Sequence, residues 1–144
     1  MLPARLSFVT LGVHDLEAQR AFYAGLGWRE GISAENFVAF DTGGAILGLF
    51  PIDDLIADAQ LAVQPNWPAF RGVTLAVNVE TPEEVDAALD AAISAGAKLL
   101  KAAHTADFGV RSGYFADPEG NVWEVAHMPG STFDERGGMI LPSP

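Results

Sequence analysis

One carboxylate stands out in this sequence because it lies in an otherwise apolar run. In "GYFADPEGNVWEVAH", Glu124 lies between Trp123 and Val125. Side chains alternate between the two faces of a strand, so Glu124 is predicted to share a face with Val122 and Ala126. The bulky Trp123 and Val125 are then predicted to lie beneath a helix. In an apolar cavity, desolvation would disfavour the charged form of Glu124 and suit it to proton transfer near neutral pH.

A second interpretation of Glu124 is equally open on the residues alone. Buried acids are usually hydrogen-bonded without being catalytic, and Thr74, Asn78 or a water could satisfy this one. The sequence therefore predicts the direction of the Glu124 side chain and leaves its role open.

The histidines offer no obvious partner for this carboxylate. His127 lies three residues after Glu124 and is predicted to point to the opposite face of the strand. His14 lies beside the start of a predicted helix, which disfavours additional positive charge, and His104 is expected in a loop. Both are expected at the surface.

Other side chains could contact a ligand. Aromatic walls suit planar or apolar ligands, and Tyr114 adds a hydroxyl group. Arg111 could bind a ligand carboxylate through two hydrogen bonds if it turned inward. Core packing for the aromatic residues and a solvated position for Arg111 are the open alternatives. The predicted contact residues are Phe8, Phe50, Trp67, Thr74, Arg111 and Tyr114, and Phe40 is a further aromatic residue that could line the cavity.

Composition excludes several classes of protein. The chain has 144 residues, of which 49% are hydrophobic, so one domain with a real core is expected. It has no cysteine, which excludes disulfides and thiolate chemistry. The net charge of -11 argues against nucleic acid. It would attract cationic small molecules, and solubility alone is the open alternative explanation of the same charge. Ser112 lies in no Gly-x-Ser-x-Gly elbow, so a hydrolase is not predicted. The sequence has no long apolar span and no signal-peptide pattern, so we expect a cytoplasmic protein rather than a membrane protein.

The elements that must position these residues occur twice along the chain. "RLSFVTLGV" alternates as a half-buried strand does, and Asp15 is a suitable N-cap for the helix that follows. "NFVAFD", a Gly43-Gly44 turn and "AILGLF" then indicate a hairpin. The second half repeats this order, beginning with the strand "GVTLAVNVE" and a helix whose Thr81 and Glu84 form a predicted capping box.

Three further strands complete the second half: "KLLKAA", "SGYFAD" and "NVWEVAH". Asp117, Pro118 and Gly120 predict a type I turn between the last two. We therefore predict an α+β fold within a single domain, residues 1–144. Module one is expected at about 5–52, a connector at about 53–71 that could begin with a short helix, module two at about 72–128, and a loosely held tail at 129–144.

This tandem repeat, with its closing "DPEGNVWEV", resembles the vicinal oxygen chelate superfamily, which includes glyoxalase I, extradiol dioxygenases and bleomycin-binding proteins. The resemblance covers about residues 5–128. It implies two βαβββ modules whose curved mixed sheets enclose a cavity with the helices outside, and it implies a homodimer. A ferredoxin-like fold lacks the extra hairpin seen in each half.

The resemblance also places the family's metal ligands at Phe8, Gly48, Thr74 and Glu124. Only Glu124 is a strong ligand for a divalent cation, because Phe8 and Gly48 have no side-chain donor and Thr74 has only a neutral hydroxyl. No cofactor is therefore predicted, and a divalent metal is the less favoured alternative.

Three functions follow from the resemblance. The first is binding of a small organic molecule in an aromatic-lined cavity without a metal, as in the bleomycin-type members. The second is an isomerase, epimerase or lyase that acts next to a carbonyl, with Glu124 as acid or base. The third is a metal-dependent glyoxalase or dioxygenase.

Overall fold

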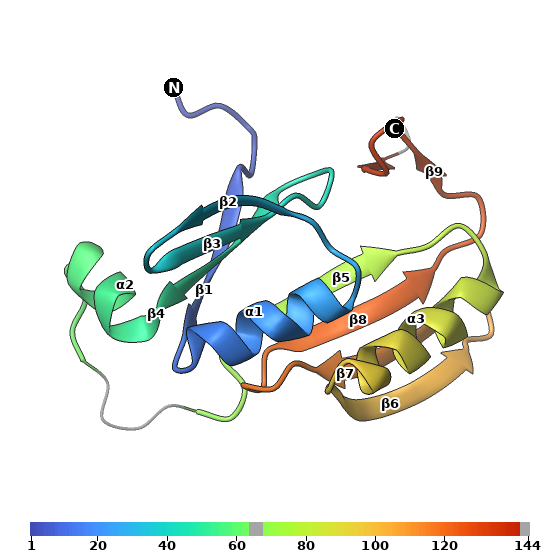
Figure 1. Cartoon of the computed structure of the whole chain (residues 1–144). Helices are drawn as coiled ribbons and strands as arrows, with labels where there is room; N and C mark the ends of the chain where they lie inside the picture. The colour runs from blue at the N-terminus through green and yellow to red at the C-terminus, as the bar shows by residue number, and fades with distance from the viewer. Residues whose placement is uncertain (64–67, 142–144) are drawn as a thin grey trace. The chain divides into compact units, whose positions relative to one another are not determined.

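The structure of the protein is a computed structural model that describes residues 1–63 and 68–141. The chain divides into two compact units, residues 1–65 and 66–144. Both units combine helices with mixed sheets, which confirms the predicted α+β class (Figure 1). Among the described residues, no helix is long and apolar enough to cross a membrane.

Unit 1 is built on a four-stranded sheet in the order β1-β4-β3-β2. The pair β1 and β4 is parallel, and the other two pairs are antiparallel. The elements in chain order are β1 (Phe8–Val13), α1 (Leu16–Gly25), β2 (Glu30–Ala34), β3 (Phe37–Phe40), β4 (Ile46–Pro51) and α2 (Ile52–Asp58). The short helix predicted at the start of the connector is thus confirmed as α2.

Helix α1 begins where the sequence predicts. The Asp15 carboxylate accepts a hydrogen bond of 3.0 Å from the backbone N–H of Ala18, which satisfies one of the free donors of the first turn. Tyr23 is fully buried, and its ring centroid lies 6.0 Å from that of Phe40 in β3. The face of the sheet that carries Phe40 is therefore the core face of unit 1. Its other members are almost fully buried: Val13, Val38, Leu47 and Leu49.

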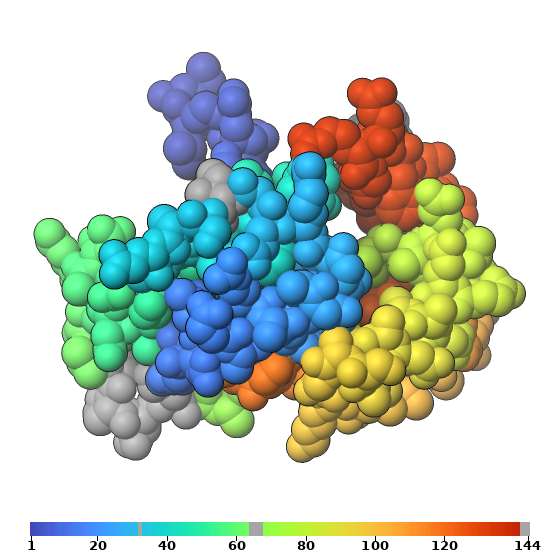
Figure 2. Space-filling view, viewed as in Figure 1, coloured from blue at the N-terminus to red at the C-terminus, as the bar shows by residue number. Residues whose placement is uncertain are grey.

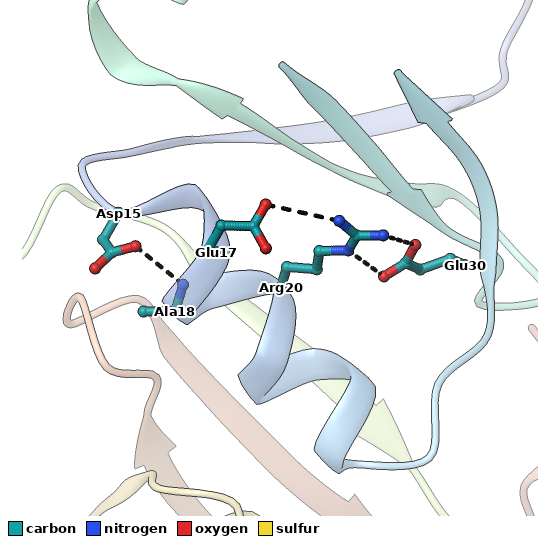
Figure 3. A network of polar contacts seen from close by, with 5 residues as sticks. All are labelled: Asp15, Glu17, Ala18, Arg20 and Glu30. Carbon is teal, nitrogen blue, oxygen red and sulfur yellow. Dashed lines mark hydrogen bonds and ion pairs between the residues drawn. The ribbon is translucent and has the colours of Figure 1, made fainter. Parts of the chain in front are cut away.

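A polar network ties the outer surface of α1 to the sheet (Figure 3). The guanidinium of Arg20 donates to both carboxylate oxygens of Glu30 at the start of β2, over 2.6 and 2.9 Å. Glu17 lies one turn earlier, 3.6 Å from the same guanidinium. The hydrogen bonds from Arg20 lower the pKa of Glu30. This pairing joins elements that the chain connects only through the Gly27 turn.

Unit 2 repeats the architecture with the strand order β5-β8-β7-β6. Here β5 and β8 are parallel, and the remaining pairs are antiparallel. The elements are β5 (Thr74–Asn78), α3 (Pro82–Ser94), β6 (Lys98–Thr105), β7 (Arg111–Ala116), β8 (Val122–His127), β9 (Thr132–Phe133) and β10 (Met139–Ile140).

Helix α3 packs against the sheet of unit 2 (Figure 1). The predicted capping box is present, because Thr81 accepts from the N–H of Glu84 and Glu84 accepts from the N–H of Thr81. Val85 and Leu89 of α3 are buried over strands that supply Trp123 and Val125. The prediction that Trp123 and Val125 lie beneath a helix is confirmed.

The turn between β7 and β8 is organised by a buried acid. Asp117 is 3% exposed, and its carboxylate accepts from the backbone N–H groups of Glu119 and Asn121 and from the Asn121 side chain. The N–H of Gly120 bonds to the Asp117 carbonyl at 2.9 Å, as in the predicted type I turn.

The tail after β8 contains a structure that the sequence did not predict. Strands β9 and β10 pair antiparallel, with Met139 opposite Phe133. The Asp134 carboxylate accepts from the N–H groups of Arg136 and Gly138 and closes the turn between the strands. In the space-filling view this hairpin forms a distinct protrusion at the end of the chain (Figure 2).

Candidate functional site

Glu124 lies in the interior of the unit 2 sheet, on β8. Its register partner on β5 is Ala76, and its partner on β7 is Tyr114. Two strands therefore flank the carboxylate, and backbone pairing holds its position on both sides.

The side chain of Glu124 points away from α3. Gly113 of β7 faces the helix, since a Cβ there would lie 2.5 Å from Leu89 of α3. Phe115, two residues on, is buried and stacks with Trp123, with ring planes only 5° apart. Because faces alternate, Tyr114 and Glu124 lie on the opposite side of the sheet. We call this side the Glu124 face, with Thr74, Ala76, Ser112, Tyr114, Val122, Glu124 and Ala126 as members.

Tyr114 and Glu124 are coupled chemically as well as by register. The Tyr114 hydroxyl donates a hydrogen bond to the Glu124 carboxylate. This bond, with smaller contributions from burial and from the carboxylate's charge, raises the pKa of Tyr114. Tyr114 therefore stays a neutral donor at physiological pH, and it orients one oxygen of Glu124. A carboxylate has further lone pairs, so Glu124 can still accept from a ligand.

Thr74 lies on the same face but is not adjacent to Glu124 in register. Its partner on β8 is Val122, one pleat before the pair of Ala76 with Glu124. Thr74 itself is exposed to solvent. Its hydroxyl thus belongs to the Glu124 face and lies at the first residue of β5.

Arg111 lies on the opposite side of the sheet from Glu124. Its guanidinium makes two 2.8 Å hydrogen bonds to the Asp86 carboxylate of α3, and a third bond of 3.1 Å to the Thr105 hydroxyl. The hydrogen bonds from Arg111 lower the pKa of Asp86. Arg111 therefore joins β7 to α3 through an ion pair, and it does not share the face of the sheet that carries Tyr114.

The histidines are placed in three different ways. His127 lies on the α3 side, with Nδ1 3.3 Å from the carbonyl oxygen of Val79. His104 lies in β6 and not in a loop, so that expectation is wrong; its register partner is Ser112. By register His104 shares the Glu124 face, but it lies opposite Ser112 and Ala126 rather than Glu124, on a strand two spacings, about 10 Å, from β8. His14 follows β1, outside unit 2.

In unit 1, Phe8 and Phe50 lie on the face of the sheet opposite the core face. Their register partners, Ile46 and Gly12, alternate with residues of the core face such as Leu47 and Val13. Phe37 joins them: its ring centroid lies 6.4 Å from that of Phe8 and 5.9 Å from that of Phe50. The expectation that Phe40 could line the cavity is wrong, because Phe40 is fully buried in the core face. The sequence interpretation missed Phe37, which the alternation in "NFVAFD" places on the opposite face. Trp67, the remaining predicted aromatic contact, lies outside the described residues.

The side chains do not fit a divalent metal held by the protein alone. Of the four positions implied by the resemblance, Phe8 and Gly48 offer no donor, and Thr74 offers a neutral hydroxyl. Glu124 is the one carboxylate among them. Within residues 1–63 and 68–141, no group of three or more His, Cys, Asp or Glu side chains is arranged to hold an ion.

Comparison with known proteins agrees with the fold and with the predicted family. The family model described as Glyoxalase/Bleomycin resistance protein/Dioxygenase superfamily matches residues 5–125. No significant match was found among curated proteins.

Solved structures similar to this chain come from several bacteria. A glyoxalase-related enzyme from Fulvimarina pelagi is 29% identical, with a TM-score of 0.87 over 98% of this chain and 100% of its own. A glyoxalase/bleomycin resistance protein/dioxygenase family enzyme from Burkholderia phytofirmans PsJN is 30% identical, with a TM-score of 0.72 over 86% and 98%. A lactoylglutathione lyase from Agrobacterium tumefaciens is 25% identical, with a TM-score of 0.67 over 88% and 95%. The chain belongs to the glyoxalase/bleomycin resistance protein/dioxygenase superfamily.

Proposed function

We propose that this protein binds a small organic molecule in an aromatic-lined cavity, with Glu124 as the polar anchor and without a divalent metal. The observation that carries the proposal is the pair of Tyr114 and Glu124. Tyr114 holds a carboxylate in the middle of a sheet face whose neighbouring positions, Ala76, Val122 and Ala126, are apolar. An anchored acceptor among apolar groups is the arrangement that orients a ligand bearing a donor.

The chemistry of the anchor favours a cationic or donor-bearing ligand. A carboxylate only accepts hydrogen bonds when ionised, and it attracts positive charge. The net charge of -11 acts in the same direction over longer distances. Thr74, at the exposed end of β5, adds a hydroxyl that can donate or accept.

The absence of a metal from this proposal rests on the ligand positions themselves. Three of the four positions at which the resemblance expects ligands carry Phe8, Gly48 and Thr74. A single carboxylate does not make a tight site, because zinc sites use three or four strong ligands. The glyoxalase and dioxygenase activities of metal-dependent relatives are therefore the least supported candidates.

The test is thermal unfolding in the presence of EDTA with defined compounds. Tyramine, benzamidine and proflavine serve as aromatic cations, and naphthalene-1-sulfonate serves as an aromatic anion. At least one cation should raise the Tm in a saturable way, because a ligand that binds only the folded state stabilises it. Glu124→Gln should weaken the effect, while Glu135→Gln, a change of the same type at an exposed turn position, should not.

The outcome that contradicts the proposal is equally defined. If none of these compounds stabilises the protein, and Zn²⁺, Ni²⁺ or Mn²⁺ binds with saturation instead, the metal-free binding function is wrong.

In a second candidate function, Glu124 acts as an acid or base and Tyr114 is its hydrogen-bond partner. Glu124 would move a proton next to a substrate carbonyl, in an isomerase, epimerase or lyase, and Tyr114 would orient the carboxylate. The hydrogen bond of Tyr114 favours this candidate, because the single proton of its neutral hydroxyl is donated to Glu124 and fixes the orientation of the carboxylate. Glu124→Gln should then abolish turnover with folding intact; unchanged turnover would contradict this role.

We also propose that the protein is a homodimer. The resemblance supports the dimer, as do apolar side chains of the C-terminal hairpin: Met139 is 38% exposed and Ile140 47% exposed. Light scattering after size exclusion tests this directly. A dimer that Ile140→Lys converts to a monomer supports the proposal, and a monomeric wild-type protein contradicts it.

A further inference from the structure

The outer strand of the unit 2 sheet is basic. This strand is β6, which ends the order β5-β8-β7-β6 (Figure 1). The sequence contains two lysines, Lys98 and Lys101, and both lie in β6 together with His104. All three residues are exposed. A chain with a net charge of -11 therefore gathers both of its lysines on one edge strand. We call Lys98, Lys101 and His104 the basic edge.

The members of the basic edge share one face of the sheet only because β6 is irregular. They lie three positions apart, and a regular strand would put the middle one on the opposite face from the other two. The pairing of β6 with β7 shifts register between Leu99 and Lys101, and again between Lys101 and His104. In chain order, the partners of the basic edge on β7 are Ala116, Tyr114 and Ser112. Residues that lie opposite one another in an antiparallel pair project to the same side, so the basic edge belongs to the Glu124 face.

Gly113 of β7 makes room for the second irregularity. A Cβ at this position would lie 2.9 Å from the carbonyl oxygen of Lys101, 3.2 Å from the backbone nitrogen of Ala103 and 2.5 Å from the Leu89 side chain. Backbone atoms of β6 thus occupy the space that a side chain at position 113 would need. The glycine lets the bulge of β6 lie close against β7, and His104 follows the bulge on the Glu124 face.

The two lysines are available to a ligand. The ion pairs of the described residues use the guanidinium groups of Arg20, Arg29 and Arg111. Within residues 1–63 and 68–141, neither lysine side chain makes an ion pair or a hydrogen bond. An ammonium group has three donors and a full positive charge, so each lysine can bind an anionic oxygen.

Groups of opposite charge lie in one row across the sheet. Lys101 on β6 is the register partner of Tyr114 on β7, which is the partner of Glu124 on β8. The two outer strands of this row are two spacings, about 10 Å, apart. An ionised carboxylate only accepts hydrogen bonds, whereas an ammonium group only donates them. The row can therefore hold one molecule at both ends, if one end carries a donor and the other an anion.

From this arrangement we infer that the basic edge binds the anionic group, a carboxylate or a phosphate, of a ligand whose cationic or donor end is held by Glu124. The inference rests on the proposed small-molecule function and makes the ligand amphoteric, with its two polar ends about 10 Å apart. His104 and its register partner Ser112 lie on the same face and can add an imidazole and a hydroxyl donor.

Two biphenyl compounds that differ in one anionic group are the probes. In 4′-(aminomethyl)biphenyl-4-carboxylate, a rigid skeleton of about the required length separates an ammonium group from a carboxylate. In 4-(aminomethyl)biphenyl the carboxylate is absent. Calorimetric titration of the whole chain in EDTA should give an affinity about fivefold higher for the carboxylate compound, which is the effect of one exposed ion pair.

Substitutions in β6 test where this advantage arises. Lys101→Met should abolish it and should not weaken 4-(aminomethyl)biphenyl, because the lysine only repels an ammonium group. Lys98→Met, at the first residue of β6, should reduce the advantage as well. Arg29→Met is the control, since it removes one positive charge from unit 1 at a side chain that is 81% exposed, and it should leave the advantage intact. Circular dichroism on each variant checks the fold.

The results separate this inference from the function on which it rests. If the two compounds bind wild type equally, or if the advantage survives in both Lys101→Met and Lys98→Met, the basic edge does not bind the anion; weaker binding of both compounds in Glu124→Gln would still support the proposed function. If the advantage depends on Lys101 while Glu124→Gln changes neither affinity, the basic edge stands and Glu124 is not the anchor. If neither compound binds, the inference is overturned, and the panel of compounds given above decides the proposed function.

Discussion

The Tyr114 hydroxyl donates a hydrogen bond to the Glu124 carboxylate across the antiparallel pair of β7 and β8. The bond raises the pKa of Tyr114 because it favours the protonated phenol. A raised pKa means that the stabilisation is present below the ordinary tyrosine value of about 10 and is lost as pH rises through the higher folded value.

This relationship predicts a change in titration. Glu124→Gln removes the negative charge and should lower the pH at which Tyr114 ionises, followed through the ultraviolet absorbance of phenolate. Tyr114→Phe identifies the transition, since Tyr23 is the one other tyrosine in the sequence. An identical titration in wild type and Glu124→Gln would show that the two groups are not coupled.

The ion pair of Arg111 with Asp86 predicts that the free energy of unfolding depends on pH. The pKa of Asp86 is lowered by Arg111, so the stabilisation is present above the ordinary aspartate value of about 4 and is lost as pH falls through the folded value. Asp86→Asn should therefore lower the urea midpoint near neutral pH, and the difference from wild type should shrink in acid. A difference that persists unchanged in acid would contradict the ion pair as its cause; Asp107→Asn, at an exposed position, is the control.

The hydrogen bonds of the buried Asp117 predict a loss of stability when its side chain is removed. Its carboxylate accepts three hydrogen bonds within the β7–β8 turn. Asp117→Ala leaves those donors without their acceptor and should cost about 1–3 kcal/mol of unfolding free energy. Urea denaturation measures this, and Asp107→Ala gives the effect of the same substitution in an exposed loop. A loss no larger than that of the control would contradict the role of Asp117.

Patterns within one element were the most predictable parts of the fold. The caps at Asp15 and Thr81, the Asp117 turn and the alternation that puts Trp123 beneath a helix depend on residues a few positions apart. Local hydrogen bonding and strand pleating determine such features, so the sequence shows them directly.

Pairings between distant elements could not be predicted in the same way. Arg111 bonds to Asp86, a residue 25 positions away in the sequence, on the face of the sheet that α3 covers. The approach of Phe37 to Gly48 requires the register of β3 with β4, which places Ala39 opposite Gly48. Neither depends on a local pattern, because strand register and helix orientation decide which side chains meet.

The most direct test of the account is the thermal unfolding of the wild-type protein with increasing tyramine, benzamidine or proflavine, in EDTA and then with added Zn²⁺, Ni²⁺ or Mn²⁺. The account predicts a saturable rise in Tm with at least one aromatic cation in EDTA, unchanged by the metal and weakened in Glu124→Gln. Stabilisation by a metal alone, with no effect of any organic compound in EDTA, would contradict it.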